Sequence, residues 1–252
     1  MHSKELLLDE FYTTIDRRQL KVETRSHGKD YIGTMWSAGE FDFGEYKNGV
    51  YKYRLSGVEP DRFTEFLEEH VEKKINLCVY FHIEKNNLFA INLDSTVKQG
   101  AEIKVMALYI AECMMKLGLP PLVIKSGHGY HFWCRICEPV ENCRLQALMN
   151  ALIKDAVQRL RAKGLKSENL QCICYPRPKA SDISIRLFGS EHIISGRFSS
   201  VVTGINTEDT VLGEEESWRY FENYMNECTA AKARVEKALD DITNMKSLDR
   251  TD

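Results

Sequence analysis

The feature of the sequence that most constrains its fold is the order of its central segments. Short apolar runs bounded by glycine or polar residues alternate there with longer segments whose apolar residues recur every three or four positions. The first pattern is typical of buried strands and the second of amphipathic helices. The order strand–helix–strand–strand–helix–strand predicts a split βαβ sheet. The predicted elements are strands over 87–93, 122–125, 130–136 and 183–188, with helices over 101–117 and 141–163.

Weaker patterns flank this central region. The alternating run at 49–55 predicts a strand, and helical spacing after Asp61, which is placed to cap a helix, predicts a helix before an apolar strand at 77–81. The acidic segment after Glu214 indicates a surface helix. We therefore predict one α/β (α+β) domain over 1–252. Its parts are an N-terminal α/β unit over about 1–84, packed on an RRM-like split βαβ unit over about 85–205, and an acidic helical segment over about 214–246.

The overall charge argues against a strong, self-sufficient nucleic-acid binder. The net charge is −3 and the pI is about 6.2. The charge is uneven, because residues 158–205 hold eight Lys and Arg against three Asp and Glu, whereas 208–252 hold six against twelve. A basic segment in an acidic chain can hold phosphates while its affinity for a long polyanion stays modest, although it is equally compatible with a solvated face.

Hydropathy and cysteine use indicate an intracellular protein. The chain has no run of about 18 apolar residues, so we expect no membrane span. The segment 1–11 is too short and too acidic for a secretory signal. Eight cysteines in 252 residues are too few for a disulfide scaffold, so we expect reduced thiols. The expected location is cytoplasmic, with nucleoid association if the source is prokaryotic, and with no membrane partner.

Polar side chains cluster where three of the predicted strands end. Asp94 and Asn92 are two residues apart, so they point to the same face of their strand. Carboxylates from two strands can hold a divalent metal, and histidine, arginine and small hydroxyl residues can hold a triphosphate. These groups together are typical of metal-dependent nucleotidyl transfer. The other candidates are Ser126, His128 and His131 after the second strand, and Asp182, Arg186, Ser190 and His192 around the fourth.

Three motifs, taken in order, resemble those of the archaeo-eukaryotic primase superfamily of primase small subunits and primase-polymerases. That family has an acidic pair, a histidine motif SGxGxH, and a lone Asp followed by a basic residue and SxH. The RLFGSEH in this chain is similar to the RLPGSLH of archaeal primase subunits. The resemblance covers roughly residues 75–205, and the ordered set is more specific than any one motif. The matching stretches are INLDS (91–95), SGHGYH (126–131) and SDISIRLFGSEHIISGR (181–197).

The resemblance implies an enzyme, a DNA-directed primase-polymerase. In the implied reaction a 3′-hydroxyl attacks the α-phosphate of a nucleoside triphosphate on a single-stranded DNA template, with two Mg²⁺ or Mn²⁺ ions, and pyrophosphate leaves. The implied partners are nucleoside triphosphates, template and primer, and a replication or defence protein. The implied catalytic and metal-binding positions are Asn92, Asp94 and Asp182, and the implied nucleotide-binding positions are Ser126, His128, His131, Arg186, Ser190 and His192.

Asn92 departs from the family pattern, which has Asp at this position. Asparagine keeps the shape and one carbonyl oxygen but removes a negative charge, and hard divalent cations prefer carboxylate oxygens. A two-metal site should therefore be weakened. Two explanations remain open: an engineered inactive variant, or a natural member that binds nucleotide or nucleic acid without efficient synthesis.

Several candidate residues also have a purely structural interpretation. Asp94 could cap a turn, His131 could be a hydrogen-bonded core histidine, and His128 could be an exposed loop residue. Arg186, on an apolar strand, needs an anionic partner, which is either a phosphate or a structural carboxylate.

The cysteines do not form a convincing zinc motif. Cys134 and Cys137 form a CxxC, but they fall on a predicted strand, where a spacing of three residues directs side chains to opposite faces. We therefore expect ordinary thiols rather than zinc.

Two other classes of function remain compatible with the sequence. One is a non-catalytic module on the same fold that holds nucleotide or single strands for a replication or defence complex. The other is an unrelated metal-dependent nuclease or a replication initiator with its own catalytic Tyr or His pair. Primer synthesis distinguishes the primase interpretation from both.

Overall fold

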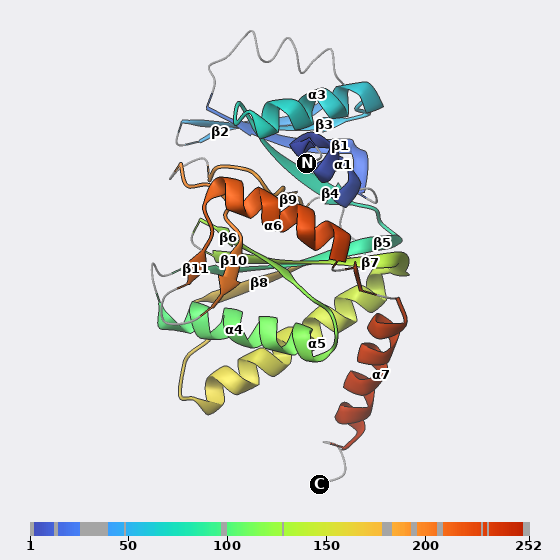
Figure 1. Ribbon diagram of the computed structural model, residues 1–252, viewed down its shortest axis with the longest axis vertical. Coiled ribbons are helices and arrows are strands. Elements are labelled where there is room, and N and C mark those ends of the chain that lie inside the picture. Colours follow the sequence, from blue (N-terminus) through green and yellow to red (C-terminus); the bar gives the residue numbers. More distant parts are fainter. Residues whose placement is uncertain are drawn as a thin grey trace. The chain divides into compact units, whose positions relative to one another are not determined.

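The chain folds into two compact units, each of which contains a β-sheet (Figure 1). The first unit consists of Met1–His82 with Ala180–Ser199, and the second of Ile83–Lys179 with Ser200–Asp252. The computed structural model describes residues 3–12, 15–25, 40–47, 49–96, 100–127, 129–177, 183–192, 196–205, 209–227, 229–230 and 232–248.

In its described residues, the first unit is an antiparallel sheet with two helices. Its elements are α1 (Lys4–Phe11), β1 (Ile15–Thr24), β2 (Glu40–Lys47), β3 (Val50–Ser56), α3 (Pro60–Val71), β4 (Asn76–Phe81) and β9 (Ile185–Arg186). The strand order is β2-β3-β1-β4-β9. On β1, buried Leu20 and Val22 alternate with the polar Lys21 and Glu23, so one face of the sheet is apolar and the other carries charge.

Local sequence patterns predicted two strands and one helix of the first unit. The strands predicted at 49–55 and 77–81 correspond to β3 and β4, and the helix predicted after Asp61 is α3. Its N-cap is Glu59 rather than Asp61, because Pro60 already occupies the first helical position. Asp61 lies instead in the first turn, where a negative charge is favourable.

The second unit contains the predicted split βαβ sheet. Its elements are β5 (Lys85–Ser95), α4 (Ala101–Lys116), β6 (Leu122–Ser126), β7 (Gly129–Glu141), α5 (Asn142–Ala162), β8 (Leu170–Tyr175), β10 (Val202–Gly204), β11 (Thr210–Val211), α6 (Glu214–Glu227), β12 (Thr229–Ala230) and α7 (Lys232–Leu248). β7 pairs with β5 and β6, β5 also pairs with β8, and all three pairings are antiparallel. The spatial order β6-β7-β5-β8 is that of a split βαβ fold.

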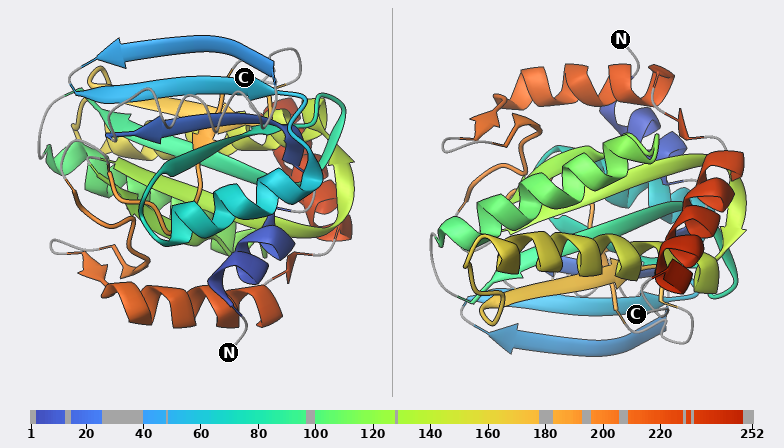
Figure 2. Two further views of the ribbon diagram at one scale, coloured as in Figure 1. Left: turned by 90° about the horizontal axis from the view of Figure 1, so that it is seen from above. Right: turned by 90° about the horizontal axis from the view of Figure 1, so that it is seen from below.

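The two helices predicted at 101–117 and 141–163 are confirmed as α4 and α5. Each is followed by a glycine with positive φ, Gly118 at 69° and Gly164 at 73°, which is the backbone conformation of a helix C-terminus. The two helices lie side by side on one face of the sheet (Figure 2). No helix in the described part of the chain is both long and apolar enough to cross a membrane.

The acidic C-terminal segment is two helices rather than one. β12 separates α6 from α7 and adds a parallel pairing at Arg135 and Ile136 of β7. α6 was predicted as a surface helix, but one of its faces is buried and carries Trp218, Phe221 and Tyr224. It lies on the side of the sheet opposite α4 and α5 (Figure 1), and its acidic residues occupy the outer face.

The strand predicted at 183–188 is much shorter and belongs to a different sheet. Only Ile185 and Arg186 form β9, which pairs with β4 of the first unit. The fourth strand of the split βαβ sheet is β8, which the sequence analysis missed. The segment 180–199 was predicted within an 85–205 unit, but its strand pairing puts it in the first unit.

Candidate functional site

Residues of the first two motifs lie together on one face of the second sheet. In β5, Phe89, Ile91 and Leu93 belong to the core with α4 and α5, so the alternate residues Asn92 and Asp94 point to the opposite face. β5 and β7 are paired such that Asn92 lies directly across from His131. Asn92 and Asp94 are half-buried, and His131 is 8% exposed. The strand register therefore brings an amide, a carboxylate and an imidazole into one neighbourhood.

The Asn92 side chain is hydrogen-bonded to Asp94. Its Nδ2 donates to Asp94 Oδ2 at 2.9 Å. This bond assigns the amide orientation, since only the NH₂ group can face a carboxylate favourably. The other end of the amide, Asn92 Oδ1, is buried and has no hydrogen-bond partner among the described residues. A buried acceptor without a partner costs free energy, so this oxygen is suited to a ligand.

Gly129 allows the second motif to approach the first. A Cβ at this position would collide with the backbone oxygen of Leu93 and with Asp94 Oδ1. Only glycine fits here, because these contacts are closer than real Cβ atoms make. The glycine of the Gly-His-Gly turn is thus required by the close packing of β7 against the Asp94 end of β5.

The hairpin that carries the histidine motif has the predicted form. Ser126 ends β6 and pairs with Gly129 at the start of β7. Gly127 takes a positive φ of 76°, as expected in a tight two-residue turn. Ser126 is buried, and its hydroxyl has no hydrogen-bond partner among the described residues. His128, in the turn, lies outside the described residues.

Two side chains of this site carry oxygen donors that could bind a divalent cation. Asp94 supplies a carboxylate and Asn92 a buried carbonyl oxygen, both hard ligands of the kind that Mg²⁺ and Mn²⁺ prefer. Within the described residues there is no group of three or more His, Cys, Asp and Glu side chains that could hold a metal ion. Asp182, the third implied carboxylate, lies outside the described residues.

The third motif is held in the first unit by a set of backbone contacts. The Leu187 N–H donates to Leu77 O at 3.0 Å, and the Phe188 N–H donates to the Tyr12 hydroxyl at 3.1 Å. His70, from α3, receives a hydrogen bond from the Leu77 N–H at Nδ1 (3.2 Å) and lies 2.9 Å from Phe188 O at Nε2. These partners select the neutral tautomer with the proton on Nε2. Burial lowers the pKa of His70 to about 4, so its imidazole is uncharged at neutral pH.

Ser190 and His192 lie on a short hairpin in this segment. The Ser190 hydroxyl donates to Leu187 O at 3.1 Å and shares a hydrogen bond with the Ser199 hydroxyl at 2.9 Å. Ser190 is fully buried, so its hydroxyl has a structural role in this conformation. His192 donates its backbone N–H to Arg197 O and accepts one from Gly196 at its own backbone oxygen.

Arg186 pairs with a carboxylate, the second of its two predicted alternatives. Its Nη2 lies 3.4 Å from Oε2 of Glu23, which is 4% exposed. Lys21 and Lys52 each approach Glu23 Oε1 at 3.6 Å. Burial alone would raise the pKa of Glu23, but the charges of Arg186, Lys21 and Lys52 hold that pKa below its usual value.

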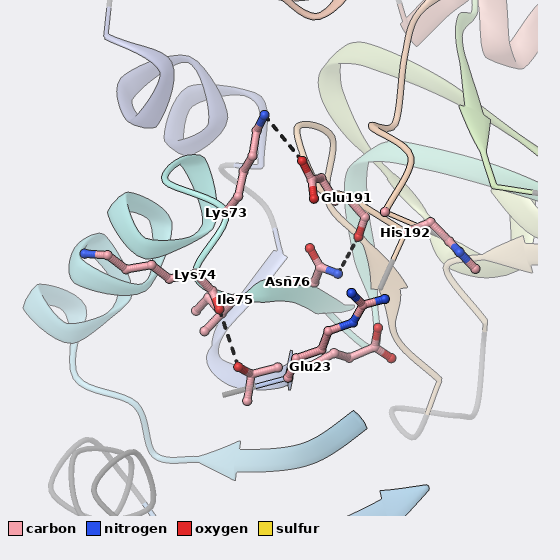
Figure 3. Close-up of a pocket in the computed structure, with 10 residues that line it drawn as sticks. Glu23, Lys73, Lys74, Ile75, Asn76, Glu191 and His192 are labelled. Atoms are coloured by element: carbon pink, nitrogen blue, oxygen red, sulfur yellow. Dashed lines mark hydrogen bonds and ion pairs between the residues drawn. The ribbon is translucent and has the colours of Figure 1, made fainter. Parts of the chain in front are cut away.

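A pocket of about 110 Å³ lies beside this ion cluster (Figure 3). Figure 3 shows the Lys73–Glu191 ion pair at one end of the pocket and Glu23 at the other. Asn76 lies between them and donates to the backbone oxygen of Glu191 at 2.6 Å. His192 also lines the pocket, although its ring points away from the other labelled residues in Figure 3.

Sequence reasoning missed Glu23 and His70. Each makes its decisive contact with the third motif across a long separation, 163 residues for Glu23 to Arg186 and 118 for His70 to Phe188. Glu23 had one local signal, because Lys21 and Glu23 alternate with the apolar Leu20 and Val22. His70 had none, because a histidine in the last turn of a helix is equally compatible with exposure.

The cysteines remain free thiols throughout the described residues. On β7, Cys134 is buried and Cys137 exposed, which is the opposite-face arrangement expected of this spacing. Cys172 and Cys174 alternate on β8, and burial raises their pKa values to about 12 and about 11.

Solved structures with a similar arrangement have little sequence in common with this chain. The polymerase domain of Mycobacterium tuberculosis ligase D, in complex with DNA, aligns with a TM-score of 0.43 and 11% identity over 96% of this chain and 86% of that chain. The AEP domain of the cyanophage S-2L primase-polymerase aligns with a TM-score of 0.39 and 13% identity over 86% of this chain and 95% of that chain. No protein-family model matches the sequence, and no curated protein matches it.

Proposed function

We propose that this chain is a primase-polymerase that transfers nucleotides from nucleoside triphosphates onto a primer or a second nucleotide, directed by a single-stranded DNA template. The observation that carries the proposal is the cross-strand pairing of Asn92 with His131, next to Asp94. This arrangement joins the acidic and histidine motifs, which resemble those of the primase superfamily, on one face of a split βαβ sheet.

The residues of the second unit then have distinct roles. His131 donates a hydrogen bond to the triphosphate, and Ser126, whose hydroxyl lacks a partner among the described residues, supplies a second donor. Asp94 would hold a divalent cation, joined by Asn92 Oδ1 once the amide turns its oxygen toward the carboxylate, and the cation would stabilise charge on the α-phosphate and on the leaving pyrophosphate. The Asn92 amide keeps Asp94 in one orientation but contributes no charge. Asp182 would complete the set of carboxylates.

Primer synthesis and extension on single-stranded DNA test this proposal. Products should be resolved on gels after incubation with labelled nucleoside triphosphates and Mg²⁺ or Mn²⁺. We expect slow incorporation by the unaltered chain and none by Asp94→Asn, which removes the negative charge but keeps the shape. Equal product from the two proteins would show that Asp94 takes no part in the reaction.

A second candidate function is a non-catalytic nucleotide- or single-strand-binding module of a replication or defence complex. The Asn92–Asp94 hydrogen bond favours it, because that bond partly satisfies the carboxylate without a cation. Calorimetry separates the two functions. Nucleotide binding that depends on His131, with no incorporation even by Asn92→Asp, would support the binding module.

A further inference from the structure

One carboxylate of the second unit holds both strands of the hairpin that carries the histidine motif. Asp209 Oδ2 accepts a hydrogen bond from Lys125 Nζ at 3.0 Å and another from the Tyr130 hydroxyl at 2.6 Å. Lys125 immediately precedes the segment 126–129, which contains the turn, and Tyr130 immediately follows it. The two residues are also direct partners in the pairing of β6 with β7, and the Lys125 ammonium lies 3.7 Å from the centre of the Tyr130 ring. One side chain from outside the hairpin therefore binds the two residues at the base of its turn.

Asp209 reaches the hairpin because its own segment is bonded to β6. The Lys125 N–H donates to Ser200 O at 2.8 Å, and Ile124 forms a β-bridge with Val201. β10 pairs with β11, which begins directly after Asp209, and both strands lie beside β6 (Figure 1). The Asp209 side chain is 6% exposed, so its hydrogen bonds are shielded from water and are stronger than they would be on the surface.

Asp209 acts from the face of the sheet opposite to the candidate nucleotide site. Tyr130 belongs to the core with α4 and α5, whereas the next residue, His131, points to the face that carries Asn92. Burial and the Asp209 carboxylate raise the pKa of Tyr130, so its hydroxyl keeps the proton that it donates. Because Asp209 binds Tyr130 and not His131, it can influence a nucleotide on the other face only through the conformation of the hairpin.

The segment 126–129 needs such a support if it is to hold a ligand in one geometry. It contains two glycines, which lose more conformational freedom than other residues when a turn is ordered. The Ser126 hydroxyl has no hydrogen-bond partner among the described residues, so this side chain does not fix the turn. Binding sites are precise where neighbouring residues lock the groups that contact the ligand. Asp209 is placed to lock the two ends of this segment.

We propose that Asp209 is a positioning residue for the nucleotide site of the second unit. Its carboxylate holds Lys125 and Tyr130 together, and this fixes the relative positions of Ser126 and His131, the two side chains assigned to the triphosphate. The inference rests on the proposed function, because it requires a nucleotide bound at His131. It adds to that function a residue that lies outside all three motifs and follows them in the chain.

Calorimetric titration of the full chain with a nucleoside triphosphate and Mg²⁺ tests the inference, at a temperature where thermal unfolding shows each variant to be folded. We expect Asp209→Ala to weaken binding about 10-fold, since it removes both bonds to the hairpin. Asp209→Asn should bind within about threefold of the unaltered chain, because its amide oxygen can replace Oδ2 and its NH₂ group can replace Oδ1, which has no partner among the described residues. The matched control is Asp155→Ala, which removes a carboxylate that accepts a hydrogen bond from Cys113 and should leave the affinity unchanged.

A double-mutant cycle distinguishes positioning from a general structural role. In a Ser126→Ala background, Asp209→Ala should weaken binding less than it does in the unaltered chain, because one of the side chains through which it acts is gone. The same loss in both backgrounds, or unchanged or tighter binding by Asp209→Ala, would overturn the inference. If Asp209→Ala does not fold, Tyr130→Phe removes one bond to the carboxylate and should weaken binding about threefold. Tyr224→Phe, which removes a hydroxyl bonded to Pro120 O, is its control and should bind like the unaltered chain.

Failure of this inference differs from failure of the proposed function. Nucleotide binding that His131→Ala weakens and Asp209→Ala does not would overturn the positioning role alone. An unaltered chain that binds no nucleotide, or binding that His131→Ala leaves unchanged, would overturn the proposed function and the positioning role with it.

Discussion

Polar groups in the motifs of the second unit lack partners, whereas those of the third motif, in the first unit, are mostly paired. Asn92 Oδ1 and Ser126 Oγ are buried without hydrogen-bond partners among the described residues. Ser190 in the first unit has two partners, and Arg186 is paired with Glu23. Because unsatisfied buried groups are costly, we expect the second unit to receive a ligand at these two atoms, whereas most contacts of the third-motif segment hold its own fold.

The largest expected effect in this comparison is that of Gly129→Ala. The added Cβ would collide with backbone at Leu93 and with the Asp94 carboxylate, so β7 must move away from β5. We expect a loss of about 3 kcal/mol in the free energy of unfolding, together with loss of nucleotide binding. Gly213→Ala is the matched control, because its Cβ would make only an ordinary contact at 3.6 Å. Urea unfolding measures both, and equal stability of the two variants would refute the close approach.

A smaller effect is expected from the titration of His70 in the first unit. Its pKa falls from 6.5 to about 4 on folding, so below pH 6.5 the unfolded chain binds a proton that the folded chain does not. The stabilisation is complete above pH 6.5 and is lost as the pH falls toward 4, a change on the order of 3 kcal/mol. Unfolding free energies measured across this range should depend less on pH in His70→Gln. An unchanged dependence would show that His70 is not the titrating group.

The smallest effects are expected at two buried serines, one with a hydrogen-bonded hydroxyl and one whose hydroxyl has no partner among the described residues. Ser190→Ala should cost about 1 kcal/mol of stability, because it removes two hydrogen bonds, and should leave nucleotide affinity unchanged. Ser126→Ala should cost little stability, because its hydroxyl has no partner among the described residues, but should weaken nucleotide binding several-fold. Thermal unfolding measures the stability of both variants, and calorimetry measures their nucleotide affinity. A larger loss of stability in Ser126→Ala, or a larger loss of affinity in Ser190→Ala, would contradict the comparison between the units.

The sequence predicted best what depends on neighbouring residues. Helical spacing and the glycines at 118 and 164 located α4 and α5 to within a residue at each end. The pairing of Asn92 with Asp94 also follows from a local spacing of two. These features are visible because the interacting groups are close in the chain.

Strand pairing between segments far apart in the chain could not be predicted from the sequence. The segment at 183–188 is apolar enough to be a full strand, yet only two residues pair, because its partner is β4 in the other sheet. β8 was missed since LQCICY is short and only its last two residues are buried. The same limit applies to the Glu23–Arg186 ion pair, whose partners lie on strands far apart in the sequence.

The most direct test of the central claim, that Asn92 and Asp94 form a cation and nucleotide site, is Mn²⁺-dependent nucleotide incorporation by Asn92→Asp. Restoring the second carboxylate should raise the rate at least about 100-fold over the unaltered chain, and Mn²⁺ titration should show tighter or additional binding. Asp94→Asn in the Asn92→Asp background should abolish both gains. Equal rates and equal Mn²⁺ binding with and without the substitution would contradict the account.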